Sequence, residues 1–226
     1  MIRFFAKGVN FLLGKSLLKK RVFIGGSLDF LHREREIDKD YFDYIRLSTL
    51  ELVSQEVRKH NLKGNVAELG VYKGKFAKYI NKYFPDRSLY LLDTFEGFDE
   101  RDVRSEQQQD FSAGNQDFSK TSVEAVLQSM PFREKCIIVK GFFPESAKDL
   151  HDDFVFVSLD ADLYEPIYNG LRFFYPRLVK GGYIFIHDFN NDHYKGARRA
   201  VEQFCAEQHI NFVPLPDSGG SAIIAK

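Results

Sequence analysis

Short apolar runs alternate with longer amphipathic segments along the chain from Asn65 onward. Short runs rich in β-branched and aromatic residues are typical of buried strands, whereas apolar residues that recur every three or four positions are typical of helices. This alternation predicts a parallel sheet whose strands are joined by crossover helices. We therefore expect an α/β fold with helices on both faces of the sheet.

Seven segments have the pattern of strands. The last two are separated by PDSGG, whose proline and glycines are typical of a tight turn, so this pair is predicted to form an antiparallel hairpin. The five earlier strands are expected to run parallel, which gives a seven-stranded, mostly parallel sheet. The predicted strands are residues 66–70, 89–93, 136–140, 154–160, 183–188, 210–215 and 221–225.

Three amphipathic stripes predict helices, one before the sheet, one over residues 76–83 and one over residues 164–178. The third should stop at Lys180, Gly181 and Gly182, because glycine commonly ends a helix. Residues 99–120 are polar and aperiodic, and a loop of this length in a compact domain is usually functional, so we expect a lid. The apolar face of the first helix is predicted to contain Phe42, Ile45, Leu52 and Val53.

The first 40 residues differ from the rest in charge, and residues 41–226 are expected to form a single domain. No acidic residue precedes Asp29, and the apolar run is too short for the core of a signal peptide. One interpretation is a basic arm or pair of helices that packs on the domain or on a second subunit. The others are peripheral contact with an anionic membrane and a cleaved signal. The basic residues are Arg3, Lys7, Lys15, Lys19, Lys20 and Arg21, and the apolar residues expected to support a homodimer are Phe4, Phe5, Leu12 and Leu13.

Composition narrows the range of functions. Of the 226 residues, 32 are Lys or Arg and 32 are Asp or Glu, and this balance argues against nucleic acid as a partner, because phosphate binding needs a basic face. No apolar run reaches the roughly 18–20 residues of a membrane span. Two cysteines, Cys136 and Cys205, do not make a disulfide framework, which fits a cytoplasmic location.

Residues at the carboxyl ends of the strands are the candidate binding residues, because open parallel sheets bind ligands there. Gly70 and Gly74 bracket a tight turn after the first strand that a ligand can approach closely, and Glu68 suits a ligand with an ammonium group. Asp93 ends the second strand, where a carboxylate commonly binds ribose hydroxyls. Taken together these residues favour an adenosine site, against the alternatives of a structural turn and a helix cap.

The third strand is followed by Gly141, Phe142 and Phe143. The glycine permits close approach, and the rings are placed to flank an adenine. The alternative is that both phenylalanines belong to the hydrophobic core. The chain contains 23 Phe, which favours this alternative.

Acidic residues end two further strands. Asp160 and Asp162 fall on the same side of one strand end, and His187 and Asp188 end the next strand. Clustered carboxylates repel one another unless they are protonated or neutralised by a cation. The set predicts a divalent cation: oxygen ligands suit Mg²⁺, and an imidazole also admits Mn²⁺, Fe²⁺ or Zn²⁺. The alternative is a set of isolated helix caps.

The combination of AELGVYKGKFA, LLDTFEGF, KGFFPES, SLDADLYEP and YPRLVKGGYIFIHDF resembles the macrocin O-methyltransferase (TylF-type) family from about residue 65 to about residue 204. The resemblance implies a Rossmann-like class I methyltransferase fold. It also implies methylation of a hydroxyl by S-adenosylmethionine, typically on a sugar, with help from a divalent cation for which Mg²⁺ is the first expectation. A saccharide acceptor and a homodimer are further implications.

The resemblance also assigns roles to individual positions. The residues implied to bind the cofactor are Glu68, Gly70, Tyr72, Gly74, Asp93, Thr94, Phe95, Gly141, Phe142 and Asp160. Those implied to hold the metal are Asp160, His187 and Asp188, and Asp162 is the implied base, with His187 as the alternative.

One position departs from the family pattern. The family usually has two consecutive acids after the fifth strand, where this chain has His187 and Asp188, and imidazole is a poor ligand for Mg²⁺. A non-catalytic binding or assembly protein with a methyltransferase fold is therefore kept as an alternative function. A nucleotide-dependent oxidoreductase is disfavoured because the G-x-G-x-x-G fingerprint is missing.

Overall fold

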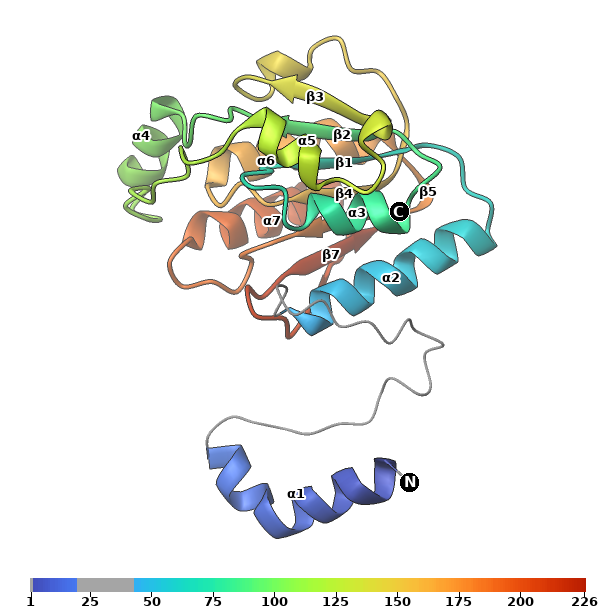
Figure 1. The fold of residues 1–226 in the computed structure, drawn as a ribbon. Helices are drawn as coiled ribbons and strands as arrows, with labels where there is room; N and C mark the ends of the chain where they lie inside the picture. Colours follow the sequence, from blue (N-terminus) through green and yellow to red (C-terminus); the bar gives the residue numbers. More distant parts are fainter. Residues whose placement is uncertain (1, 20–42) are drawn as a thin grey trace. The chain divides into compact units, whose positions relative to one another are not determined.

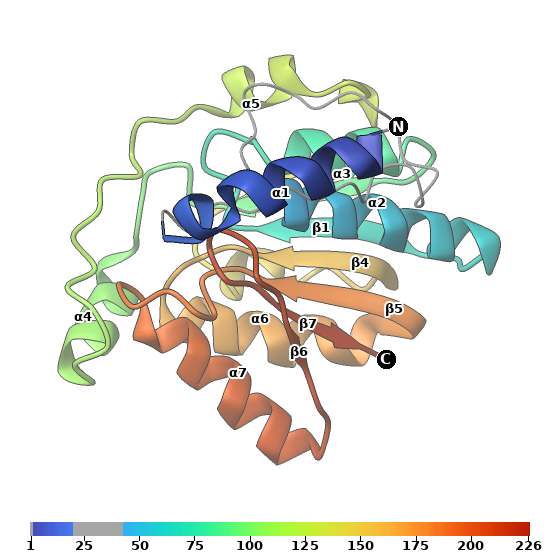
Figure 2. The same ribbon diagram turned by 90° about the horizontal axis from the view of Figure 1, so that it is seen from below.

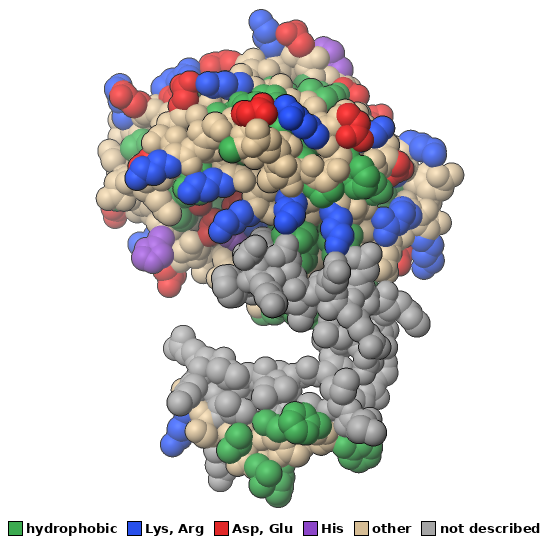
Figure 3. All heavy atoms as spheres, viewed as in Figure 1, with side chains coloured by type: hydrophobic (Ala, Val, Ile, Leu, Met, Phe, Trp, Pro, Cys, Tyr) green, Lys and Arg blue, Asp and Glu red, His purple; other side chains and the backbone are tan. Residues whose placement is uncertain are grey.

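A computed structural model describes residues 2–19 and 43–226 of the chain. The chain divides into two compact units, residues 1–40 and 41–226. Of the first unit the structure describes the helix α1 (Ile2–Lys19). Lys20, Arg21 and Phe42 lie outside the described residues. Apolar side chains lie exposed on α1 (Figure 3), namely Phe4, Phe5, Phe11, Leu12 and Leu13.

The second unit is built on a seven-stranded sheet with the strand order β3-β2-β1-β4-β5-β7-β6 (Figure 1). The first five strands in chain order are parallel, and β7 is antiparallel to both β5 and β6. The expected mostly parallel sheet with an antiparallel C-terminal hairpin is confirmed. The strands are β1 (Asn65–Leu69), β2 (Leu89–Asp93), β3 (Cys136–Lys140), β4 (Phe154–Leu159), β5 (Leu178–Ile186), β6 (Val213–Pro214) and β7 (Ala222–Ala225).

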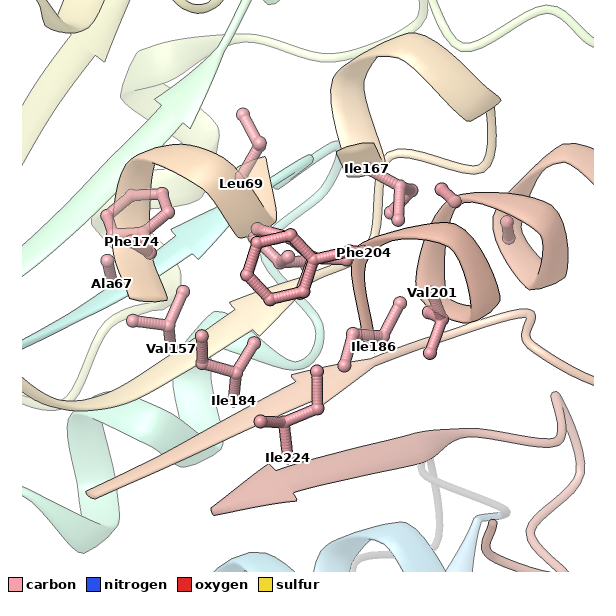
Figure 4. Close-up of a cluster of buried hydrophobic side chains, with 14 of the residues drawn as sticks. Ala67, Leu69, Val157, Ile167, Phe174, Ile184, Ile186, Val201, Phe204 and Ile224 are labelled. Atoms are coloured by element: carbon pink, nitrogen blue, oxygen red, sulfur yellow. The ribbon is translucent and has the colours of Figure 1, made fainter. Parts of the chain in front are cut away.

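Helices cover both faces of this sheet (Figure 2). On one face, α2 (Tyr44–Lys59), α3 (Ala77–Tyr83) and α5 (Val123–Ser129) cover a core that includes Phe156 and Phe185. On the other face, α6 (Tyr164–Arg177) and α7 (Lys195–Gln208) pack on β1, β4, β5 and β7. Figure 4 shows Phe204 of α7 among the side chains of these strands, and this ring is only 2% exposed. Burial of such side chains is the main force that holds the layers together.

Several elements differ from the sequence predictions. Helix α6 ends at Arg177, and β5 begins at Leu178 and continues through Gly181 and Gly182, so the glycines lie inside a strand rather than stopping a helix. Strand β6 contains two residues instead of the six expected, and its Pro214 has no N–H with which to extend the ladder. The buried side chains of α2 are offset from the predicted face, because Ile45 and Leu52 are only partly buried.

The predicted loop over residues 99–120 is wrong in its first half, which forms the helix α4 (Glu100–Gln108). Asp99 caps this helix by accepting a hydrogen bond from the backbone N–H of Arg101 at 2.9 Å. Glu106 is buried and accepts the backbone N–H of Tyr164 at 2.8 Å, which ties α4 to the start of α6. An almost wholly polar helix has no apolar stripe, so periodicity does not detect it. The short 3₁₀ turns are η2 (Arg133–Lys135) and η3 (Glu145–Ala147).

Candidate functional site

The carboxyl ends of four strands are held at one level by backbone hydrogen bonds that continue just beyond the ladders. Gly70 donates to Leu92 at 2.9 Å, Asp160 donates to Leu69 at 2.8 Å, and the N–H of His187 donates to Leu159 at 2.9 Å. These bonds place residues that are far apart in the sequence around one opening, as expected at the carboxyl edge of a parallel sheet.

A cavity of about 410 Å³ lies at this edge. Its volume is within the range of about 300–1,000 Å³ that is usual for small-molecule sites. Most of the predicted site residues line it together: Glu68, Gly70, Tyr72, Asp93, Thr94, Gly141, Phe142, Asp160, Asp162, His187 and Asp188.

Two predicted cofactor residues do not line this cavity. Gly74 adopts a left-handed backbone with φ of 72°, and a Cβ at this position would press on Met130 and Val126. Phe95 is 6% exposed and packs in the core between the sheet and α3. Both residues have a left-handed backbone and help to shape turns near the cavity.

Glu68 is the buried acid of the first strand end. Its side chain is 1% exposed, and its Oε2 has no hydrogen-bond partner among the described residues. Burial, with repulsion from Asp160, raises the pKa of Glu68 well above its usual value. A buried carboxyl oxygen without a partner is costly unless a ligand supplies one, and an ammonium group would do so.

Asp93 fastens the turn that follows β1. Its Oδ2 accepts the backbone N–H groups of Val71 at 2.6 Å and Tyr72 at 2.9 Å, and its Oδ1 accepts that of Phe95 at 2.6 Å. Gly70 is required in the same turn, because its φ is 84° and a Cβ there would collide with the carbonyl oxygen of Asp160. The first two strand ends therefore form one rigid unit.

A charged cluster occupies the ends of β4 and β5. Arg46 of α2 donates from Nη1 to Asp160 Oδ2 at 3.0 Å. His187 Nδ1 lies 3.0 Å from Asp160 Oδ1 and 2.7 Å from Asp188 Oδ2. Asn191 donates to the other oxygen of Asp188 at 2.6 Å. The two positive groups thus face the carboxylates that were expected to need a metal.

The electrostatics of the cluster follow from these contacts. Burial alone would raise the pKa of Asp160, but the charges of His187 and Arg46 outweigh it and hold the pKa below its usual range. Burial favours neutral His187, but Asp160 and the hydrogen bonds to Asp160 and Asp188 raise the pKa of His187 to about 10. Burial and the nearby Asp188 and Asp160 raise the pKa of Asp162 well above its usual value.

Arg46 is a site residue that the sequence prediction missed. It lies on the same helical stripe as Leu50, Val53 and Val57, and its side chain is only 3% exposed. An arginine in line with buried aliphatic residues is unusual, because charged side chains are rarely buried unless they are paired. The spacing of Arg46 from these apolar residues was a signal in the sequence. It indicates that the arginine side chain faces the interior of the domain rather than solvent.

An aromatic wall closes the side of the cavity nearest to residues 99–120. The ring of Phe118 lies 5.0 Å from those of both Tyr72 and Phe98. Tyr194 packs edge-on against Phe98 at 6.5 Å, and its hydroxyl donates to Gln116. Phe118 and Gln116 come from the second half of the predicted lid, so this half covers the cavity.

Comparisons with known proteins agree with this arrangement. The family model for macrocin O-methyltransferase (TylF) matches residues 41–217. Demethyldecarbamoylnovobiocin O-methyltransferase of Streptomyces niveus is 25% identical over 162 residues, which are 64% of this chain. The chain spans about 60% of the length of that relative.

Solved structures share the fold. The O-methyltransferase NovP superposes with a TM-score of 0.67 at 21% identity, over 80% of this chain and 79% of that one. The calicheamicin methyltransferase CalS11 superposes with a TM-score of 0.63 at 20% identity, over 80% of this chain and 78% of that one. At these identities the superpositions show the fold, which is that of class I methyltransferases.

Proposed function

Because the chain belongs to the macrocin O-methyltransferase (TylF) family, we propose that it transfers a methyl group from S-adenosylmethionine to a hydroxyl of a sugar or sugar-containing metabolite. One observation carries the proposal. A single cavity joins Glu68, whose buried oxygen has no partner, to Asp162 and the aromatic wall. A cofactor and an acceptor can therefore meet inside one enclosure.

The cofactor end of the cavity fits S-adenosylmethionine. Glu68 would bind the ammonium group of its methionine part, and the turn after β1 lets the backbone approach it at Gly70. Asp93 Oδ1 has one short bond, from the Phe95 N–H, and one long contact of 3.5 Å from Thr94, so this oxygen would accept a ribose hydroxyl. Gly141 and Phe142 would bound the adenine, where Arg101 stacks on the Phe142 ring at 3.4 Å and keeps that ring in place.

Asp162 is the proposed base. The bound cofactor supplies an electrophilic methyl group on a sulfonium, so that the C–S bond breaks with its electron pair left on sulfur. The acceptor oxygen forms the new bond to carbon, and its proton passes to the Asp162 carboxylate. Asp162 suits this role better than His187, because the Nδ1 of His187 is already engaged between the carboxylates of Asp160 and Asp188. Most of the rate gain should come from alignment of the reacting atoms.

A saccharide is the proposed acceptor. The wall formed by Tyr72, Phe98, Phe118 and Tyr194 offers apolar faces, while Gln116 and Asn191 offer polar groups, which is the mixture a sugar ring needs. The names of the relatives agree, since one is a novobiocin-type O-methyltransferase and another, CalS11, is described as a TDP-rhamnose 3'-O-methyltransferase.

The sequence predicts a divalent cation held by Asp160, His187 and Asp188, with Mg²⁺ first and Mn²⁺ or another dication as the alternative. The donor atoms lie within 4.8 Å of one another, which is close enough to share an ion. Their contacts argue against it, because both oxygens of Asp160 and the Nδ1 of His187 are already engaged with charged partners. The residues present do not fit a dication as they stand.

Two predictions for the N-terminal unit also remain, homodimer formation and peripheral contact with an anionic membrane. Both rest on basic residues beside apolar ones, such as Phe4 and Phe11, which are 82% and 89% exposed. Among the described helices, none has the length and apolar character needed to cross a bilayer. Mass measurement in solution and flotation with phosphatidylglycerol vesicles separate the two predictions. A cytoplasmic location is likewise a proposal.

Calorimetric titration with S-adenosylmethionine is the first test, with NAD⁺ and NADP⁺ as comparison ligands. Micromolar binding of S-adenosylmethionine alone is expected. A panel of nucleotide sugars and glycosides then tests transfer, with mass spectrometry to detect an added methyl group. Binding without transfer to any of them would favour the non-catalytic alternative, and preference for NAD⁺ or NADP⁺ would overturn the proposal.

A further inference from the structure

We propose that the Arg46 guanidinium takes the place of a divalent cation as the partner of Asp160, so that the site works without a bound metal. The use of the site for methyl transfer rests on the proposed function. The exclusion of the metal rests on contacts within this chain alone, and the two can be tested separately.

Arg46 is locked in position. Its second nitrogen, Nη2, donates to Ser158 Oγ at 3.2 Å, and the guanidinium lies over the ring of Phe76 at 3.8 Å. Its backbone N–H is capped by Asp43 at 3.0 Å. A buried guanidinium that is stacked, hydrogen-bonded and attached to the first turn of a helix cannot swing aside to admit a cation.

Both oxygens of Asp160 already face a basic side chain. Its Oδ2 accepts from Arg46 and its Oδ1 faces His187, each at 3.0 Å. A metal at either oxygen would have to displace a positive group, and the repulsion between a dication and a guanidinium is large at such distances in a partly desolvated site. Clustered carboxylates must be neutralised, and here the side chains of Arg46 and His187 do this instead of a metal.

His187 is the second basic side chain that takes the place of a metal beside these carboxylates. Its Nδ1 sits between Asp160 and Asp188, and potential ligand atoms of Asp43 and Asp217 lie within 4.8 Å of one of its ring nitrogens. Gly219 makes room for the ring, because a Cβ there would collide with it. A ring nitrogen that donates its proton to a carboxylate has no lone pair to offer a metal.

Arg46 is therefore a positioning residue that acts through Asp160. Asp160 follows β4, and its carbonyl packs against the glycine turn that receives the cofactor, so fixing its side chain also fixes that turn. Asp162, two positions later, lines the same cavity.

Electron paramagnetic resonance of Mn²⁺, titrated into the full-length protein with and without S-adenosylmethionine, tests the proposal. The wild-type protein is expected to leave the free-ion signal unchanged up to millimolar Mn²⁺. Saturable binding of one Mn²⁺ per chain that is lost in Asp160→Asn would overturn the proposal. Calorimetry with S-adenosylmethionine on the same samples tests the proposed function independently, because it does not depend on the metal.

Two variants test whether the named side chains exclude the ion. Arg46→Met combined with His187→Asp frees Asp160 and restores a third acid, and should bind Mn²⁺ at least about ten-fold more tightly than wild type. Arg46→Lys keeps the charge and should remain unable to bind. Arg58→Met is the matched control, because Arg58 also lies on α2 and donates to a serine, Ser54, away from the cavity. No gain of affinity in a double variant whose circular dichroism is native would refute the role of these side chains.

Discussion

Asp43 and Ser218 lie 175 positions apart, and a single carboxylate oxygen joins them. Asp43 Oδ2 accepts the backbone N–H of Ser218 at 3.0 Å and its hydroxyl at 2.8 Å, while Oδ1 caps α2 at Arg46. The start of the helix that carries Arg46 is thus fixed to the turn between β6 and β7, whose Gly219 covers His187.

Asp43→Ala should lower the free energy of unfolding by about 1–3 kcal/mol, since it removes a helix cap and two further hydrogen bonds. Urea unfolding followed by circular dichroism measures the change. Ser122→Ala is the matched control, because Ser122 caps α5 by one bond to Ala125 and makes no long-range contact of this kind. A loss no larger than that of the control would mean that the link to Ser218 contributes nothing.

Glu68→Gln should weaken S-adenosylmethionine binding by roughly ten-fold to a hundred-fold, because a neutral amide cannot pair with an ammonium group as a carboxylate does. Thermal stability of the ligand-free protein should not fall, since burial already disfavours the charged form of Glu68. Calorimetry and thermal unfolding provide the two readouts. Glu96→Gln, which alters an exposed ion pair with Lys140, should leave the affinity unchanged, and an equal effect in both variants would argue against the ammonium site.

Asp162→Asn should reduce kcat by about 10²–10⁴-fold with little effect on S-adenosylmethionine binding, because it removes only the proton acceptor. Asparagine is the suitable replacement, since residue 162 has a left-handed φ of 58° that asparagine tolerates. The assay is methyl transfer to whichever sugar the panel identifies. Transfer at the wild-type rate would exclude Asp162 as the base.

Stability should fall as the pH rises through about 7, because of Asp102. Burial, followed by the charges of Asp99 and Glu165, raises the pKa of Asp102 to about 7. The folded protein therefore keeps a proton that the unfolded chain loses near its ordinary pKa of 3.8, and stability declines with pH between these values. Thermal unfolding as a function of pH measures this decline. It should be shallower in Asp102→Asn, and parallel curves would show that Asp102 ionises normally.

Phe118→Ala should raise the KM for the sugar acceptor several-fold, because it removes the ring that joins Tyr72 and Phe98 in the aromatic wall. Phe118→Tyr keeps the ring and should behave like wild type. The dissociation constant of S-adenosylmethionine is measured alongside, because Phe118 packs on Tyr72, which is a predicted cofactor residue. If Phe118→Ala changed only the affinity for S-adenosylmethionine, the aromatic wall would be assigned to cofactor binding instead of acceptor binding.

Local patterns in the sequence sufficed for much of the fold. The runs at Leu89–Asp93 and Cys136–Lys140 are short, apolar and bounded by turn residues, so their strands were predicted to the residue. The strand ends were found for the same reason, and with them Glu68, Asp93 and Asp160. Helix α4 was missed because its stability comes from the Asp99 cap and from the buried Glu106, which leave no apolar period in the sequence.

The short apolar runs indicated which residues end the strands, because each buried run gives way to polar or glycine residues at the edge of the sheet. Only the tertiary structure decided how their charges are neutralised. The sequence showed Asp160, Asp162 and Asp188 as uncompensated acids, and a metal was the simplest answer. The structure brings Arg46 to Asp160 across 114 positions. Coulomb energy depends on distance in space, and a local pattern does not contain that distance.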